Sequence, residues 1–153
     1  MNRTPLLVTL LGLAGLLPFL VCGFESLRHA ASWALPALIG YGAVTLSFLG
    51  AVHWGLALAA GAPPSSPEAE RLRLSLGILP ALTGWVALLL PLWAGLLLLI
   101  GGFIASVVVE AAAHRRALVP AGYMWLRWTH SVIVVAILIT VLVLRLIGAT
   151  IVI

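Results

Sequence analysis

The sequence has very little charge and almost no cysteine. Its 153 residues include no lysine and no aspartate, and 8% are charged. Soluble domains carry roughly a quarter charged residues. Because so few polar groups cannot cover a water-exposed surface, a soluble globular domain is excluded. The single cysteine, Cys22, excludes an internal disulfide. The formal charge of +4 is too small to indicate nucleic-acid binding.

Long apolar runs take the place of the missing charge. Hydrophobic residues make up 63% of the chain, and the mean hydropathy is +1.24. The runs are about twenty residues long without polar alternation, which is typical of membrane-spanning helices rather than barrel strands. Helices also satisfy their own backbone groups in lipid. We therefore predict an all-α, polytopic membrane protein.

The apolar runs divide the chain into five predicted spans within a single integral membrane domain, residues 1–153. They cover residues 5–22, 35–60, 72–90, 92–113 and 124–147. The first run resembles a signal peptide, but large residues precede Cys22 and no Ala-x-Ala site follows. We expect it to remain as a membrane helix. Pro80 lies in the middle of the third span and predicts a kink there.

The arginines predict the orientation of these spans, because cytoplasmic loops carry an excess of positive charge. Six of the eight arginines fall on the side of the N-terminus, and two fall on the other side. The bundle is therefore expected in a bacterial inner membrane, with its N-terminus in the cytoplasm and its C-terminus in the periplasm. The first group is Arg3, Arg71, Arg73, Arg115, Arg116 and Arg127, and the second is Arg28 and Arg145.

Ionisable residues inside the predicted spans gather in the cytoplasmic leaflet. His53 lies near the inner end of the second span, Glu110 near that of the fourth, and Arg127 and His130 at the start of the fifth. Because the fourth loop is short, we expect the last two spans to be antiparallel neighbours. A contact from Glu110 to Arg127 or His130 follows, since an intramembrane carboxylate normally has a partner or a cavity.

Small residues follow one face of the second span. Ala43, Ser47, Ala51 and Gly55 recur every four residues, a ladder that lets another helix approach closely. His53 points roughly opposite this ladder. A helix with a packing ladder on one face and an ionisable group on the other is expected at the centre of the bundle.

Each polar candidate has a structural and a functional interpretation. His53 is either a hydrogen-bonded packing residue or a ligand-binding or proton-handling group. Glu110 and Arg127 form either a buried pair that fixes helix packing or a site for a proton or a head group. Trp54, beside His53, either packs or stacks on a planar ligand such as a quinone head.

Metal and enzyme chemistry are weakly represented. Three histidines and a glutamate, namely His53, His114, His130 and Glu110, could hold haem or a transition metal. No paired Glu-x-x-His motif supports this, so we expect neither. Phosphate loops, dinucleotide glycine motifs and serine elbows are also missing.

Three segments resemble one known family. These are YGAVTLSFLGAVHWGLAL at residues 41–58, LGLAGLLPFL at 11–20 and RLRLSLGILPALTGWVALLL at 71–90. Together they look like a bacterial and mitochondrial membrane-protein family of unknown function that includes transmembrane protein sixty-nine. Members often carry arginine at the position of His53, which implies a basic group for an anionic or polar partner. The distribution of the family suggests energy-transducing membranes.

The sequence therefore favours a non-enzymatic protein. Our first expectation is an accessory subunit or assembly factor of a larger, plausibly respiratory, membrane complex. The alternative is a quinone- or lipid-binding protein that uses the layer of polar residues, and a small transporter is a further alternative. Expected partners are membrane lipids and either another membrane protein or further copies of the chain. The residues of the layer are His53, Trp54, Glu110, Arg127 and His130.

Overall fold

The computed structural model describes residues 4–28, 32–58, 67–115 and 121–148. Within these ranges the chain is helical and no β-strand is present, which confirms the predicted all-α class. The helices are α1 (Thr4–Ala14), α2 (Leu17–Glu25), α3 (Ala34–Leu58), α4 (Pro67–Leu89), α5 (Leu92–Arg115) and α6 (Ala121–Leu146).

Three of these helices are long and apolar enough to cross a membrane. They contribute Ala34–Gly55, Leu92–Ala112 and Arg127–Leu146. Two further apolar stretches, Thr9–Glu25 and Leu74–Leu89, are shorter. The chain is a helical membrane protein, and the count of five crossings stays a prediction.

The first predicted span is not one continuous helix. It is interrupted at Gly15 and Leu16, between α1 and α2. Pro18 lies in the first turn of α2, where its missing N–H is tolerated, and it cannot continue the hydrogen bonding of α1. The carbonyl of Gly15 accepts a hydrogen bond from the Tyr41 hydroxyl of α3 at 3.0 Å. A side chain thus compensates for the break in the helix.

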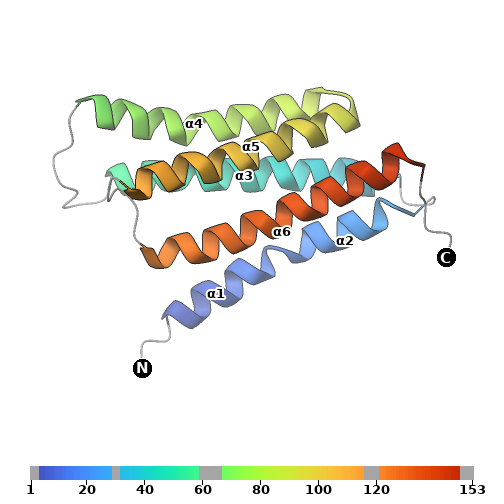
Figure 1. Cartoon of the computed structure of the whole chain (residues 1–153), viewed down its shortest axis with the longest axis horizontal. Helices are drawn as coiled ribbons and strands as arrows, with labels where there is room; N and C mark the ends of the chain where they lie inside the picture. The colour runs from blue at the N-terminus through green and yellow to red at the C-terminus, as the bar shows by residue number, and fades with distance from the viewer. Residues whose placement is uncertain (1–3, 29–31, 59–66, 116–120, 149–153) are drawn as a thin grey trace.

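Helices α1 and α2 run one after the other in the same direction, and α3, α4, α5 and α6 then alternate in direction beside them (Figure 1). The beginnings of α1, α4 and α6 share one end of the bundle with the last turns of α3 and α5. The opposite end holds the close of α2, the tight turn between α4 and α5, and the last turn of α6. α5 and α6 are antiparallel neighbours, as predicted.

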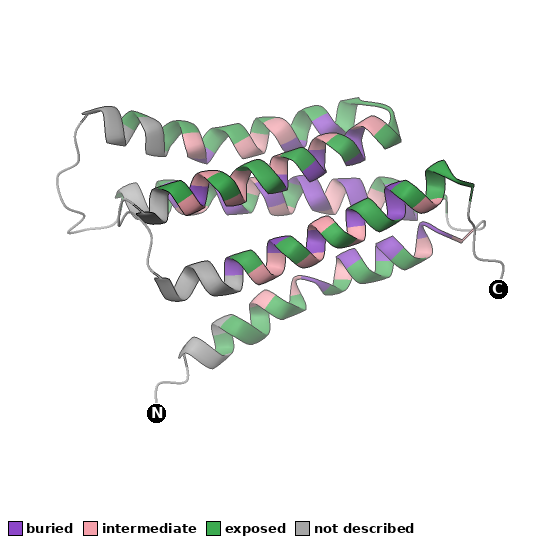
Figure 2. Ribbon diagram, in the orientation of Figure 1, coloured by how far each residue is buried: buried purple, intermediate pink, exposed green. Residues whose placement is uncertain are grey.

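Helix α3 is the centre of the bundle. It packs against α2, α4 and α5, and its membrane-length window is 44% buried, against 28% for those of α5 and α6. Figure 2 shows buried residues on the helix faces that turn toward each other and exposed residues on the outer faces, and many of the exposed residues are large and apolar. Phe19, Phe103 and Leu138, from three different helices, are among the fully buried side chains. The predicted central position of the second span is confirmed.

Glycines bring α3 and α4 together. A Cβ added at Gly50 would lie 2.5 Å from the carbonyl oxygen of Gly77, and one at Gly84 would lie 2.8 Å from that of Ala43. Both helices therefore present small residues seven positions apart, Ala43 and Gly50 against Gly84 and Gly77. Such close backbone approach is the usual way in which membrane helices pack.

The end of the bundle opposite His53 and Glu110 is tied by Arg145. Its Nη1 donates to the carbonyl of Ser26, just beyond the end of α2, at 2.6 Å. A cation at a helix C-terminus stabilises the carbonyl groups left without partners there. The nearby Glu25 and Arg28 form a half-exposed ion pair at 3.0 Å.

Candidate functional site

A buried ion pair joins α5 and α6. The Nε of Arg127 donates to Oε1 of Glu110 at 3.1 Å and lies 2.9 Å from Oε2. Both side chains are almost completely buried, with exposures of 3% for Glu110 and 1% for Arg127. The predicted contact between these two residues is confirmed. Such a pair needs further hydrogen bonds to offset its desolvation.

Two serines supply those hydrogen bonds to the guanidinium. Nη1 of Arg127 donates to Ser131, four residues along the same helix, and Nη2 donates to Ser106 of α5 at 2.9 Å. Ser106 in turn donates to the carbonyl of Phe103. Each of the three guanidinium nitrogens therefore already has an acceptor within the bundle.

His53 brings α3 to the same carboxylate. Its Nε2 lies 3.8 Å from Oε1 of Glu110, which is too far for a hydrogen bond and close enough for an electrostatic contact. The imidazole is buried, with a residue exposure of 7%. Oε2 of Glu110 is buried and accepts no hydrogen bond, because the N–H of Arg127 points at Oε1 instead. The carboxylate therefore keeps unused acceptor capacity.

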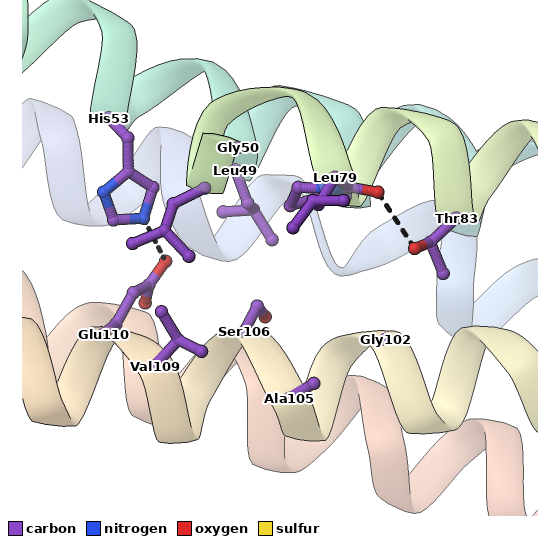
Figure 3. Close-up of a pocket in the computed structure, with 12 residues that line it drawn as sticks. Leu49, Gly50, His53, Leu79, Thr83, Gly102, Ala105, Ser106, Val109 and Glu110 are labelled. Carbon is purple, nitrogen blue, oxygen red and sulfur yellow. Dashed lines mark hydrogen bonds and ion pairs between the residues drawn. The ribbon is translucent and has the colours of Figure 1, made fainter. Parts of the chain in front are cut away.

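A cavity of about 130 Å³ lies between α3, α4 and α5 beside this carboxylate. Figure 3 shows His53 and Glu110 at one end of it and Thr83 at the other. The Thr83 hydroxyl donates to the carbonyl of Leu79 at 2.9 Å. The walls are mostly apolar. Lining residues are Leu49, Gly50, His53, Leu76, Leu79, Pro80, Thr83, Gly102, Ala105, Ser106, Val109 and Glu110.

Trp54 does not reach the cavity, although it follows His53 in sequence. Its indole ring lies against Gly77 of α4, and its Nε1 donates to the carbonyl of Leu74 at 2.9 Å. The ring is partly exposed on the outside of the bundle. Trp54 therefore joins α3 to α4, and the structure places it away from any ligand beside His53.

His130 is also separate from the carboxylate. The imidazole is partly buried near the break in the first helical segment, where it interacts with the backbone of Gly12. Its Cε1 would lie 3.5 Å from a Cβ built at Gly15. The polar residues that the sequence predicted to form one layer thus fall into two separate groups. His53, Glu110 and Arg127 come together, whereas His130 faces the N-terminal helices.

The small-residue ladder divides along its length. Ala43 is buried against α4, and the hydroxyl of Ser47 donates to the Ala43 carbonyl at 2.8 Å. Ala51 and Gly55 are exposed, and a Cβ at Gly55 would meet no atom within 4 Å. The close contact between α3 and α4 continues through Gly50, which is not part of the predicted ladder.

The described part of the chain contains no cluster of side chains arranged as a metal-binding site. There, no group of three or more His, Cys, Asp or Glu side chains is placed to hold one ion. The side chain of His114, which the sequence grouped with the other candidates, lies outside the described side chains.

Three contributors to the site were not assigned their roles from sequence. Ser131 stands four residues after Arg127, so helical spacing alone could have identified it as a guanidinium acceptor. Ser106 lies four residues before Glu110, so the sequence places both on one face of a helix. The sequence does not show that Ser106 accepts a hydrogen bond from Arg127. Gly77 carried no usable signal, because its role depends on where the Trp54 ring lies.

Comparisons with known proteins give a family and no activity. A family model described as "Protein of unknown function (DUF3429)" matches residues 4–143. The chain is 40% identical to Transmembrane protein 69 of Xenopus tropicalis over 84 residues, which is 52% of this chain. The match spans 31% of that relative's length. No solved structure matches.

Proposed function

The chain belongs to the DUF3429 family of proteins of unknown function, and on that premise we propose that it is a non-enzymatic membrane protein that binds a small molecule from the bilayer. The site is the cavity beside His53 and Glu110. One observation carries this proposal: an apolar cavity between three helices ends at a buried, ionisable pair of side chains.

The cost of burying these groups supports a role in binding. Ionisable side chains inside a membrane are expensive and normally mark a ligand or proton site. Arg127 and its two serines explain how Glu110 is tolerated. They do not explain His53, which is buried on a different helix and borders open space.

The proposed setting is a bacterial inner membrane crossed five times. α1 and α2 together would form the first crossing and α4 the third. The N-terminus would lie in the cytoplasm and the C-terminus in the periplasm. With this orientation the cavity opens within the cytoplasmic half of the bilayer, where lipids and other bilayer-soluble molecules can reach it.

The test is to identify small molecules that remain with the purified protein. The chain is isolated from native membranes in mild detergent, and its extract is analysed by mass spectrometry. We expect one compound in stoichiometric amount. His53→Leu should reduce its occupancy at least severalfold without lowering the unfolding temperature to the same extent.

Trp54→Phe is the matched control, because it changes the neighbouring residue outside the cavity. This variant should keep the compound. The proposal fails if no compound is retained, or if the His53→Leu and Trp54→Phe proteins retain it equally.

An accessory-subunit role stays a second candidate, and one observation favours it. Ala51 and Gly55 leave an exposed, small-residue surface at the end of α3, which a transmembrane helix of a partner protein could approach closely. Gly55→Leu should then release a co-purifying membrane protein while the chain itself stays folded. If the chain purifies without any stoichiometric partner, this candidate is lost. The transporter alternative stays a prediction.

A further inference from the structure

We propose that the cavity takes a neutral six-membered ring with oxygen atoms at opposite positions, the chemistry of a quinone or quinol head, rather than the phosphate of a lipid head group. This inference rests on the proposed function and names the class of ligand. Three features carry it: the size of the cavity, its two polar ends, and the way in which Arg127 is occupied.

The size suits a single ring. A volume of about 130 Å³ is close to that of an engineered apolar cavity of about 150 Å³ that binds benzene. Gly50 and Gly102 contribute only backbone to the lining of the cavity. Leu49, Leu79 and Pro80 provide apolar surfaces for the faces of a ring.

The two ends offer complementary hydrogen-bonding groups. At one end, the imidazole of His53 can donate to a ring carbonyl or accept from a ring hydroxyl. At the other, the Thr83 hydroxyl uses its proton on Leu79, so its oxygen can accept from a ring hydroxyl. A quinol, which has hydroxyl groups on opposite sides of its ring, can meet both groups, whereas the oxidised quinone can accept only from His53.

The separation of the two ends agrees with this. Thr83 lies level with Gly102 on α5, and His53 lies level with Glu110. Eight residues of helix span about 12 Å. Two hydrogen bonds of about 2.8 Å with a six-membered ring between their outer atoms cover a comparable distance.

A phosphate has no partner in this cavity. Binding it would need a cationic donor that faces the cavity, and the guanidinium of Arg127 is directed instead at Glu110, Ser131 and Ser106. Arg127 is also not among the residues that line the cavity. The Glu110 carboxylate at the polar end would repel an anion. Of the polar or anionic partners that the family resemblance implies, a neutral polar one fits this chain.

The experiment measures binding of two probes to the full chain in lipid nanodiscs. One probe is a short-chain ubiquinone, and the other is a short-chain phosphatidylglycerol. The variant is Ala105→Leu, which extends an exposed, cavity-lining residue into the open space and leaves the buried core unchanged. Ala112→Leu is the matched control, an exposed alanine of the same helix outside the cavity lining.

We expect saturable, one-to-one binding of the quinone that Ala105→Leu abolishes and Ala112→Leu leaves unchanged. Loss of one hydrogen bond in His53→Leu should weaken it about tenfold, which corresponds to about 1.4 kcal/mol. If the phospholipid binds and responds to Ala105→Leu while the quinone does not, the ring inference is overturned and the proposed function stands. If neither probe responds to Ala105→Leu in folded protein, the ring inference is overturned, and the compound retained from native membranes decides the proposed function separately.

Discussion

Glu110 has two basic neighbours, and they depend on its charge to different degrees. Arg127 is held by a short ion pair, whereas His53 lies 3.8 Å away. Neutralising Glu110 would leave the guanidinium buried with two serine acceptors and no counter-charge. His53, which can be neutral, would lose much less. The residue that depends most on Glu110 is therefore Arg127.

The Glu110→Gln variant should lower the free energy of unfolding by about 3–5 kcal/mol, the usual cost of leaving a buried charge without its partner. Combining it with Arg127→Met should recover a large part of that loss, because both charges are then removed. Reversible unfolding in mixed detergent micelles measures both effects. Glu25→Gln is the control, since its partly exposed ion pair with Arg28 lies nearer the surface, where such pairs contribute about 0–1 kcal/mol. Equal effects of Glu110→Gln and Glu25→Gln would contradict this account.

The residue-scale predictions succeeded where helical spacing and a short loop decided the contact. Glu110 and Arg127 lie at facing ends of consecutive helices, so their meeting followed from topology. Trp54 and His130 could not be placed in this way. Each lies within one turn of a site residue, but their side chains leave their helices in other directions. The direction of the Trp54 side chain depends on how closely α4 approaches α3, and that of His130 depends on how closely α1 approaches α6.

At the scale of helices, substitutions at two glycines of α3 are expected to have opposite effects on stability. A Cβ at Gly50 would collide with the Gly77 backbone at 2.5 Å, and a backbone atom cannot move aside without separating α3 from α4. A Cβ at Gly55 would meet nothing within 4 Å.

Gly50→Ala should therefore destabilise the protein by about 1–3 kcal/mol, the usual cost of overpacking. Gly55→Ala should be neutral or stabilising by up to about 1 kcal/mol, because alanine favours a helix more than glycine does. Thermal unfolding of both variants in the same detergent measures the difference. Equal destabilisation by the two substitutions would show that α3 and α4 do not pack as described.

The sequence predicted the long helices well and the first segment poorly. Predicted residues 35–60 and 92–113 correspond closely to Ala34–Leu58 and Leu92–Arg115. Helix α4 begins at Pro67, ahead of the membrane span predicted from residue 72, because a proline is favoured in the first turn of a helix. The first span was predicted as continuous, since its hydrophobicity masked Pro18. Pro80 behaves differently from Pro18, because α4 remains helical on both sides of it.

At the scale of the whole molecule, burial changes how the arginines should be counted. Arg127 was counted as a topology signal on the cytoplasmic side, but its charge is neutralised by Glu110 inside the bundle. Arg28 on the opposite side is likewise paired with Glu25. Removing both from the count leaves five arginines against one, so the predicted orientation is unchanged.

An alkaline phosphatase fused to the C-terminus should therefore be active, because this enzyme folds only in the periplasm. A fluorescent protein fused to the N-terminus should be bright in the cytoplasm. The two reporters exchanged between the termini are the control and should both be inactive. If only the exchanged reporters are active, the orientation is the reverse of the predicted one. If the same reporter is active at both termini, the termini lie on one side and the number of crossings is even.

The interruption between α1 and α2 bears on how the protein is made. Eleven residues of α1 and nine of α2 span only about 17 and 14 Å, so neither can cross a hydrocarbon core of about 30 Å alone. The Gly15 carbonyl receives its hydrogen bond from Tyr41, which leaves the ribosome 26 residues later. The first segment to be synthesised thus gains this hydrogen bond only after α3 arrives beside it. We therefore expect membrane insertion of the N-terminal segment to be coupled to its packing against α3.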